Sequence, residues 1–420
     1  MIITFITPEY PPEMVGGLGT HVQELARGLS AAGIEVHVFA AGVRFATSHQ
    51  DGKVSVHYIA VPEAKNKTPY SLSLEAASSL NRRVATTVRE YFLRLNKRPS
   101  VIHIHDWYGF EAADWLRSAF EIPVITTIHA LVGPILELYQ IPLAGNEVIK
   151  LERRCCQGSN RMIAVSKSVA EDLERLYSVP RHRVNVVWNG FDIGRFLTRH
   201  EKSVNFDSIC NSLLKNGEQG IVFAGRLAPH KGVLPLLRSA KQVIAEIKNV
   251  RYLIAGELRG SRYLDILRSV VAEDPMLAEK ITFVGMIRRE HLAALYQLST
   301  LAVVPSLYEP FGYAAIEPMS VGRPVVAAQV GGLNEIIVHD HSGILVPTGI
   351  STINGVRELD PSKLAEAQLQ LLSNPAKAKG LGKEAQCQVM RQFSVQRMVE
   401  ETHACYAAAA NHYKRATASY

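Results

Sequence analysis

The chain has 420 residues, of which 47% are apolar and 20% charged, and its formal net charge is +7. This length favours two domains of roughly 200 residues each over one continuous core. The modest positive charge suits an anionic ligand such as a phosphorylated compound. No motif that reads DNA or RNA accompanies it, so no nucleic-acid partner is expected.

The N-terminus and the cysteines predict a cytoplasmic protein. The opening residues, MIITFIT, are apolar over a short run without a basic leader, which is typical of a strand and not of a signal peptide. No apolar run approaches the ~20 residues of a membrane span. Neither a disulfide framework nor a zinc site fits the five cysteines, Cys155, Cys156, Cys210, Cys387 and Cys405.

The first part of the chain alternates short runs of valine and isoleucine with longer amphipathic segments, as in a parallel sheet covered on both faces. A helix is predicted over residues 20–33, with Thr20 as its N-cap and Gly33 at its end. Strands are predicted at 2–7, 34–40, 55–61, 101–105, 124–129, 161–166 and 184–190.

After residue 190 the pattern changes. Residues 193 to about 218 are polar and irregular, which predicts a linker into a second domain. The pattern then resumes, with a helix near 232–247 and a final helix of roughly 395–415 that is long enough to return to the first domain. Strands are predicted there at 220–226, 251–257, 281–287, 301–307, 324–329 and 343–347.

We therefore predict an α/β protein with two doubly wound, Rossmann-like domains. The first comprises residues 1–192 with a returning helix of about 397–420, and the second comprises 193–396. Such sheets bind ligands at the carboxyl ends of their strands, so the expected site is a cleft between the two domains, which would close by hinging near 190–195.

A glycine-rich turn, EMVGGLGTH, lies between the first strand and the first helix. At Gly16 and Gly17 the backbone is able to approach a phosphate. The alternative is an ordinary flexible turn. The spacing differs from the dinucleotide-binding fingerprint, so a Rossmann dehydrogenase is disfavoured.

Two cations occur in the stretch FAGRLAPHKG, residues 223–232. Arg226 follows a predicted strand and Lys231 precedes a predicted helix, whose positive dipole end adds to their charge. Arginine and lysine together suit a diphosphate. The alternative is a pair of solvated surface cations, which the position at a strand end disfavours.

Two carboxylates occur in SLYEPFGYAAIEPMSVG, residues 306–322. Glu309 precedes a helix predicted to begin near Phe311 and Gly312, and Glu317 lies about 9 Å further along its axis at ~1.5 Å per residue. One carboxylate is able to accept hydrogen bonds from a sugar and the other from a ribose. Between them, the N–H groups of Phe311, Gly312 and Tyr313 would meet phosphates. The alternatives are a capping carboxylate at 309 and an exposed one at 317.

Asp106 and His129 each end a predicted strand of the first domain. The alternative for Asp106 is a helix N-cap, and for His129 a buried core histidine. His103 and His105 accompany Asp106, but strand alternation points these two histidines one way and His129 belongs to another element. There is no Asp-x-Asp pair, so no metal and no other cofactor is expected.

The motifs GGLGTH, GRLAPHKG and YEPFGYAAIEP resemble those of the retaining glycosyltransferases of family four, which have the GT-B fold, and more distantly those of glycogen and starch synthases. NGFD at 189–192 is a weaker supporting sign. The resemblance covers nearly the whole chain. It implies a cytoplasmic hexosyltransferase of polysaccharide or glycoconjugate synthesis, which uses a nucleotide sugar without a metal.

The resemblance also implies roles for particular residues. Arg226 and Lys231 would bind the donor diphosphate, Glu309 the sugar hydroxyls and Glu317 the ribose. The Gly16–Gly17 loop would contact phosphate and sugar, His129 would lie near the transferred sugar, and Asp106 would orient the acceptor or a loop. Glu257, at the end of a predicted strand, joins the substrate-binding set.

The donor is expected to be UDP-glucose, and the acceptor a glycan, a lipid-linked sugar or a small molecule. Glycogen and starch synthases usually carry lysine where this chain has Met14, which disfavours an ADP-glucose-dependent glucan polymerase but leaves it open. A phosphorylase, a nucleotide-sugar epimerase and an inactive nucleotide-sugar-binding protein also stay open.

The segment 81–99 interleaves basic with apolar residues. It predicts either a surface helix that covers the first sheet, which is favoured, or a weak peripheral contact with the inner face of an acidic membrane.

Overall fold

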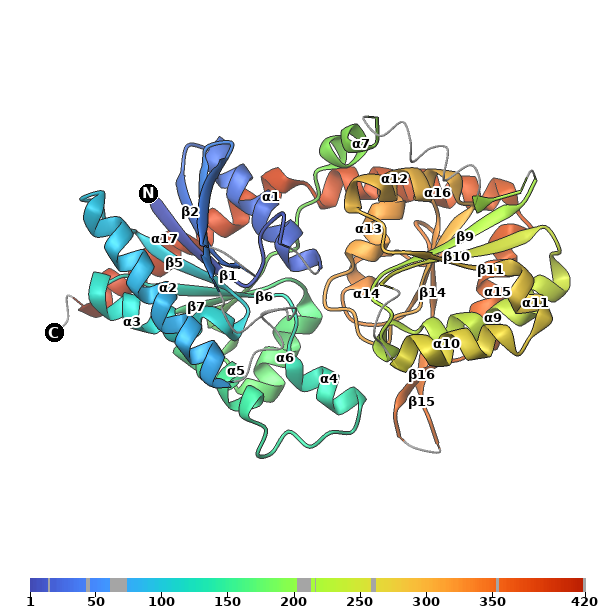
Figure 1. Ribbon diagram of the computed structural model, residues 1–420, viewed down its shortest axis with the longest axis horizontal. Helices are drawn as coiled ribbons and strands as arrows, with labels where there is room; N and C mark the ends of the chain where they lie inside the picture. The colour runs from blue at the N-terminus through green and yellow to red at the C-terminus, as the bar shows by residue number, and fades with distance from the viewer. Residues whose placement is uncertain are drawn as a thin grey trace. The chain divides into compact units, whose positions relative to one another are not determined.

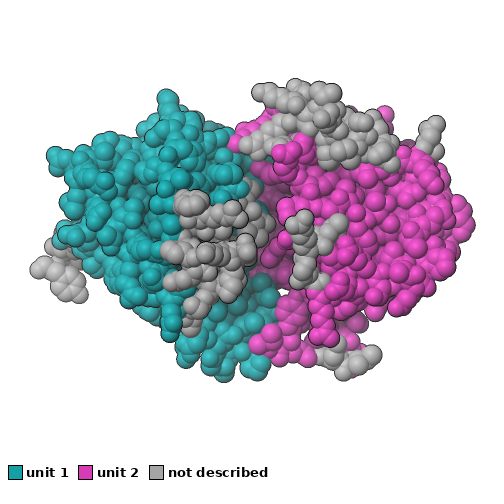
Figure 2. All heavy atoms as spheres, in the orientation of Figure 1, with its two compact units in different colours: residues 1–136, 142–191, 393–420 teal, residues 137–141, 192–392 magenta. Residues whose placement is uncertain are grey.

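The computed structural model describes residues 1–13, 16–42, 46–60, 74–201, 213–215, 217–257, 262–352 and 355–417. The chain divides into two compact units, coloured separately in Figure 2. The first comprises Met1–Leu136, Pro142–Phe191 and Phe393–Tyr420, and the second comprises Glu137–Ile141 and Asp192–Gln392. The short segment Glu137–Ile141 groups with the second unit, which the linear domain boundaries did not anticipate.

The first unit is an eight-stranded sheet with helices on its faces (Figure 1). Its strands are β1 Ile2–Thr7, β2 Glu35–Gly42, β3 Thr47–Asp51, β4 Val54–Ala60, β5 Val101–His105, β6 Val124–Ile128, β7 Arg161–Ala164 and β8 Val184–Val186. Their order is β3-β4-β2-β1-β5-β6-β7-β8, and all pairs are parallel except β3 with β4. The helices are α1 Gly17–Ala31, α2 Leu74–Arg94, η2 Trp107–Gly109, α3 Phe110–Phe120, α4 Val132–Leu138, α5 Glu147–Gly158, α6 Lys167–Tyr177, η3 Arg181–Arg183 and α17 Val395–Thr417.

The second unit is a six-stranded, fully parallel sheet with an added hairpin. Its strands are β9 Gln219–Ala224, β10 Val250–Ala255, β11 Ile281–Gly285, β12 Leu301–Val304, β13 Val325–Ala328 and β14 Ile344–Val346, followed by the hairpin strands β15 Thr348–Ile350 and β16 Arg357–Leu359. The sheet order is β11-β10-β9-β12-β13-β14. The helices are α7 Ile193–Glu201, η4 Pro229–Lys231, α9 Val233–Glu246, α10 Arg262–Ala272, α11 Pro275–Lys280, α12 Arg289–Leu298, α13 Tyr313–Ser320, α14 Leu333–Ile336, α15 Pro361–Leu372 and α16 Pro375–Gln392.

The prediction of two doubly wound α/β sheets is confirmed, whereas some local predictions differ from the structure. The predicted strand 184–190 ends at Val186, and the antiparallel strand β3 was missed. The predicted linker begins with the helix α7, which packs against α12. Residues 202–212 and 216 of that linker lie outside the described residues, as does Cys210. Among the described cysteines, all four are free thiols.

Helix α1 shows how a distant residue moves a helix start. The predicted N-cap Thr20 lies inside the helix, which begins at Gly17 with Gly16 as N-cap. The reason is a tertiary contact: the Gly16 N–H donates to Glu9 Oε2 at 3.1 Å. The apolar face of α1 is buried, and Gly28 lies so close to α17 that an added Cβ would meet Val399 at 2.5 Å. Gly33, with φ +83°, follows the helix as predicted.

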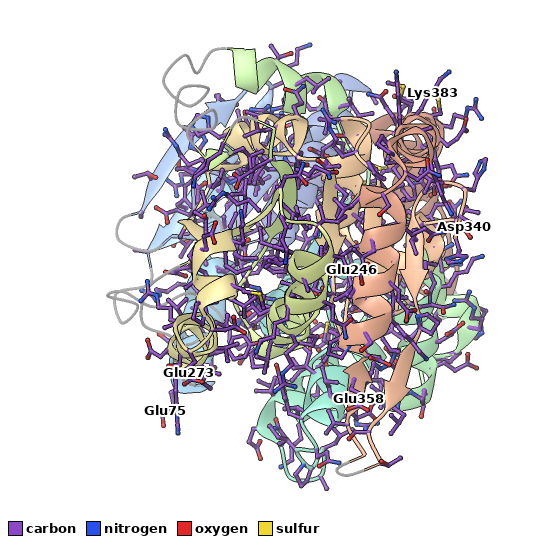
Figure 3. The ribbon with its side chains drawn as sticks, turned by 90° about the vertical axis from the view of Figure 1, so that its right-hand side faces the viewer. Glu75, Glu246, Glu273, Asp340, Glu358 and Lys383 are labelled. Atoms are coloured by element: carbon purple, nitrogen blue, oxygen red, sulfur yellow. The ribbon has the colours of Figure 1, made fainter. Side chains whose placement is uncertain are left out.

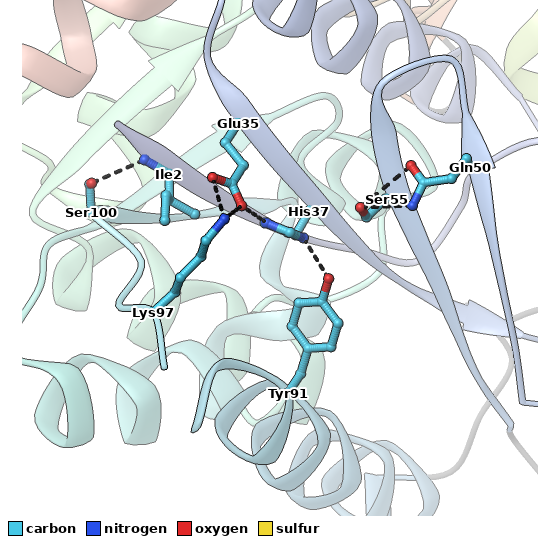
Figure 4. Close-up of polar contacts among 8 residues, drawn as sticks. All are labelled: Ile2, Glu35, His37, Gln50, Ser55, Tyr91, Lys97 and Ser100. Carbon is cyan, nitrogen blue, oxygen red and sulfur yellow. Dashed lines mark hydrogen bonds and ion pairs between the residues drawn. The ribbon is translucent and has the colours of Figure 1, made fainter. Parts of the chain in front are cut away.

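Helix α2 covers the first sheet, which supports the favoured interpretation of the basic segment. Its apolar side chains Val84, Val88 and Phe92 are buried in the core of this unit and are not available to a membrane. At its C-terminal end, Lys97 Nζ donates to Glu35 Oε1 at 2.7 Å, and the Tyr91 hydroxyl lies 3.1 Å from His37 Nδ1 on β2 (Figure 4). None of the helices in the described part of the chain is both long and apolar enough to span a bilayer.

Candidate active site

The first group of predicted residues lies in the second unit, where two loops meet at the carboxyl ends of β9 and β12. Gly232 ends η4 with φ +71°, and a Cβ there would lie 1.9 Å from the carbonyl oxygen of Pro305. Leu307 N–H also donates to the His230 carbonyl at 2.8 Å. The β9–α9 loop therefore rests on the segment that follows β12, and only glycine permits that approach.

This packing brings Lys231 and Glu309 together. Lys231 Nζ donates to Glu309 Oε2 at 2.8 Å, and Ser306 Oγ donates to the same oxygen at 3.1 Å. Glu309 is 8% exposed, whereas other acidic side chains of this unit, such as Glu273 and Glu358, are exposed and project outward (Figure 3). Since its partners are Lys231 and Ser306, and the cap of α13 is Gly312 without a side-chain bond, Glu309 is not a capping carboxylate.

A third loop, after β13, encloses the backbone of Glu309. Gly332 N–H donates to the Glu309 carbonyl at 2.9 Å. A Cβ on Gly331, where φ is +45°, would lie 2.3 Å from that same oxygen. These two glycines were not among the predicted residues, although they lie between a strand and a helix start, as Gly16 and Gly17 were predicted to do.

Helix α13 begins at Tyr313, later than predicted. Gly312 is its N-cap with φ +128°, a conformation that side chains rarely adopt, and a Cβ there would lie 3.0 Å from Leu333 and Ile336. Phe311 is buried and its ring packs edge-on against Tyr313. The first turn of the helix, with its positive dipole end, thus follows Glu309 directly along the chain.

Glu317 is a buried, paired carboxylate and not an exposed one. It is 8% exposed, and Arg289 Nε donates to its Oε1 at 3.3 Å. Desolvation raises the pKa of Glu317, and the charge of Arg289 opposes that rise. The Arg289 guanidinium also lies 5.9 Å from the centroid of the Tyr313 ring. Arg289 was not among the predicted residues, because it lies 28 residues before Glu317 with no local motif to mark it.

Arg226 and Glu257 each lie just beyond the carboxyl end of a strand, β9 and β10 respectively, and both side chains are exposed. Two backbone contacts hold these adjacent ends together: Gly225 N–H donates to the Ala255 carbonyl at 3.0 Å, and a Cβ on Gly256 would lie 2.5 Å from the Gly225 carbonyl oxygen. Arg226 is thus positioned as predicted, but it does not join the Lys231–Glu309 pair.

The second group of predicted residues lies in the first unit. Gly16 and Gly17 are exposed at the N-terminus of α1, and a Cβ on Gly16 would meet nothing within 4 Å. The buried Glu9 already accepts the Gly16 N–H, so this helix start carries its own carboxylate beside the predicted phosphate contact. Met14 and Val15 of the same turn lie outside the described residues.

Asp106 links two strand ends and does not cap a helix. Its Oδ1 accepts the backbone N–H groups of His129 at 2.7 Å and Ala130 at 3.4 Å. It occupies the N-cap position of η2 but makes no side-chain cap bond there, so its side chain serves the strand ends instead. Its φ of +57° is unusual for aspartate. Burial raises the pKa of Asp106 to about 8, against the lowering effect of those two hydrogen bonds.

His129 lies beside His105 although the two belong to different elements. Strands β5 and β6 are neighbours, so their ends bring His105 Nδ1 within 3.1 Å of His129 Nε2. The expectation that these histidines lie apart is therefore wrong. His103, by contrast, has partners at both ring nitrogens, the Tyr406 hydroxyl and Thr127 Oγ1, each at 2.7 Å.

Comparison with known proteins identifies the family of the chain. The profile described as "Glycosyltransferase Family 4" matches residues 15–195, and "Glycosyl transferases group 1" matches residues 218–374. An uncharacterized glycosyltransferase of Methanocaldococcus jannaschii is 31% identical over 350 residues, 82% of this chain and 85% of its own length. A glycogen synthase of Mycobacterium tuberculosis is 26% identical over 421 residues, 97% of this chain and 95% of its own length.

Among solved structures, sucrose-phosphate synthase from Thermosynechococcus elongatus has a TM-score of 0.76 at 23% identity, with both chains fully covered. HepE of Anabaena, solved with UDP-glucose, has a TM-score of 0.72 at 17% identity, over 97% of this chain and all of its own. At these identities the likeness is one of fold. The chain belongs to the family-four glycosyltransferases and has the GT-B fold. It is a glycosyltransferase related in sequence to glycogen synthase.

Proposed function

We propose that this glycosyltransferase moves glucose from UDP-glucose to a glycan, lipid-linked or small-molecule acceptor, in polysaccharide or glycoconjugate synthesis. Transfer retains the configuration of the anomeric carbon and needs no metal ion. The observation that carries the proposal is the Lys231–Glu309 pair, which sets a cation beside a carboxylate that directly precedes the start of α13.

The chemistry follows from where charge develops. As the bond between sugar and phosphate breaks, negative charge grows on the departing diphosphate. Lys231, with the first turn of α13, would stabilise that charge more strongly in the transition state than in the bound donor. Arg226 would add a second, exposed cation that binds phosphate bidentately. The departing phosphate then accepts the proton of the acceptor hydroxyl, so no protein nucleophile is needed.

The two carboxylates bind the uncharged groups at the two ends of the donor, the sugar and the ribose. Glu309 accepts hydrogen bonds from sugar hydroxyls once the phosphate draws Lys231 away. Glu317 accepts hydrogen bonds from the ribose, and Arg289 keeps that buried carboxylate in place. The roles of Gly16, Gly17, Glu257, Asp106 and His129 toward donor or acceptor remain predictions made from the resemblance.

The support for a UDP-sugar comes from the fold shared with HepE, a protein solved with UDP-glucose. An ADP-glucose-dependent glucan polymerase is the second candidate, favoured by the relationship to glycogen synthase over 97% of the chain. An inactive nucleotide-sugar-binding protein is the third candidate, and it would bind donors without releasing a nucleotide.

The test measures nucleoside diphosphate release from UDP-, ADP- and GDP-glucose, with and without EDTA, with NMR of the product anomer. We expect UDP-glucose to be consumed fastest, EDTA to have no effect, and Lys231→Ala to lower turnover by about 100-fold. Lys383→Ala, on the exposed face of α16 (Figure 3), is the matched control and should leave turnover unchanged. Full activity of Lys231→Ala would contradict the phosphate assignment, and faster use of ADP-glucose would favour the polymerase.

A further inference from the structure

Three histidines of the first unit converge at one point. His21 lies on α1, His105 ends β5, and His129 follows β6. One ring nitrogen from each residue lies within 4.8 Å of the other two. The closest pair is His105 Nδ1 and His129 Nε2 at 3.1 Å, and the rings of His21 and His129 have centroids 4.6 Å apart. This cluster draws on elements far apart in the sequence but packed within a single unit.

The cluster has hydrogen-bonding capacity that the described residues do not use. His21 Nδ1, His21 Nε2 and His105 Nε2 are buried without a hydrogen-bond partner there, and so is Asn189 Oδ1. Asn189 lies beside His21, close enough for its side chain to interact with the imidazole. An unsatisfied buried polar group costs roughly 1–3 kcal/mol, so a water or an ion that one nitrogen of each ring reaches would lower that cost.

The chemistry of the set favours a transition metal over a hard cation. Unprotonated imidazole is a preferred ligand of zinc, nickel and copper, whereas magnesium and calcium take oxygen ligands. In a tetrahedral zinc site with Zn–N bonds of ~2.0–2.1 Å, neighbouring ligand nitrogens lie about 3.4 Å apart. The His105–His129 pair already has nearly that spacing, and the other separations, all within 4.8 Å, would close by at most about 1.4 Å.

We propose that His21, His105 and His129 form a binding site for a divalent transition-metal ion of the zinc class. Water or Asn189 Oδ1 takes the fourth position. His129 is the one partly exposed member and gives the ion its route of entry. The ion is not required for the glucosyl transfer proposed above. Because the ion binds a ring nitrogen of His129, it blocks the contact between His129 and the sugar, and zinc therefore inhibits the enzyme.

The experiment uses the full chain, with any affinity tag removed and metal stripped by EDTA and gel filtration. Cobalt(II) titration followed by visible absorption, and zinc titration by calorimetry, report the number of sites and their affinity without any donor present. We expect one equivalent of each ion with a tetrahedral cobalt spectrum. Magnesium should not compete.

His21→Ala and His129→Gln are expected to weaken zinc binding by at least about 100-fold, beyond the 10–100-fold typical of residues outside the ligand shell. His182→Ala, an exposed histidine of the same unit, is the matched control and should bind as wild type. Melting curves in EDTA establish that each variant is folded. Because His129 is partly exposed, His129→Gln keeps the test decisive if His21→Ala does not fold. Equal zinc binding by wild type and His129→Gln, or no stoichiometric binding at all, would overturn the proposal.

Discussion

The Lys231–Glu309 pair allows the two roles of one lysine, counter-ion and phosphate ligand, to be separated. The perturbation is a cycle of three variants: Lys231→Met, Glu309→Gln and the double variant. If Lys231 acts only as the counter-ion of Glu309, neutralising the carboxylate should remove the need for it. If Lys231 binds phosphate, the double variant should regain stability but turn over more slowly than Glu309→Gln, which lacks only the carboxylate.

The expected magnitudes follow from the burial of the pair. Removing one partner of a buried ion pair costs about 3–5 kcal/mol of unfolding free energy. Here the side chains keep 16% and 11% exposure, and Ser306 still donates to the carboxylate, so we expect about 2–3 kcal/mol for Lys231→Met. The double variant should recover about half of that loss through a coupling of ~1–2 kcal/mol. Turnover of the double variant should stay about 100-fold below that of Glu309→Gln.

The assay must report on the unit that contains the pair. All three tryptophans, Trp107, Trp115 and Trp188, lie in the first unit, so their fluorescence does not follow unfolding of the second. Calorimetric unfolding, which resolves separate transitions, is the appropriate measurement, with nucleotide release as the activity readout. Equal turnover in Glu309→Gln and the double variant would refute the phosphate role. An absence of coupling would refute the energetic importance of the pair.

The remaining predictions concern backbone geometry, pH and the ribose. Gly232→Ala should destabilise the second unit by roughly 2–5 kcal/mol from left-handed strain and overlap. The control is Gly217→Ala, at φ +83° in open space, which should lower the free energy of unfolding by only the ~1–2 kcal/mol of left-handed strain. Equal losses of stability in the two variants, measured by calorimetry, would refute the role of overlap at Gly232. With a pKa of about 8, folded Asp106 keeps a proton between pH 4 and 8 that the unfolded chain has released. The free energy of unfolding therefore falls as pH rises through that window. In Asp106→Asn, unfolding followed by tryptophan fluorescence should show a smaller fall. Parallel pH profiles of the two proteins would contradict the raised pKa. Glu317→Gln should abolish the calorimetric preference for UDP over 2′,3′-dideoxy-UDP, which we expect to be about 10-fold in wild type, and an unchanged preference would exclude a ribose contact.

The fold was predictable from the sequence because its signals are local. Runs such as VIHIH and LAVVP are apolar over the length of one buried strand, and the segments between them repeat with helical spacing. The motif YEPFGYAAIEP identified the family because the structure restricts its glycine and each of its two glutamates to one residue type. Gly312 requires φ +128°, and both carboxylates are buried.

The partners of the candidate residues were not predictable in this way. Glu317 pairs with Arg289, and Asp106 holds the backbone of His129; in each case sheet order brings together residues more than 20 positions apart. The start of α1 moved for the same reason, because Glu9 supplies an acceptor from outside the helix.

The sequence alone predicted the two sheets, the family and most of the candidate residues, from the order of apolar runs, glycines and charges along the chain. Only the tertiary structure decided which charges meet and which polar atoms are left unsatisfied, as in the cluster of His21, His105 and His129. The physical reason is that strand identity depends on neighbours in sequence, whereas an ion pair or a ligand cluster depends on which strand ends lie side by side.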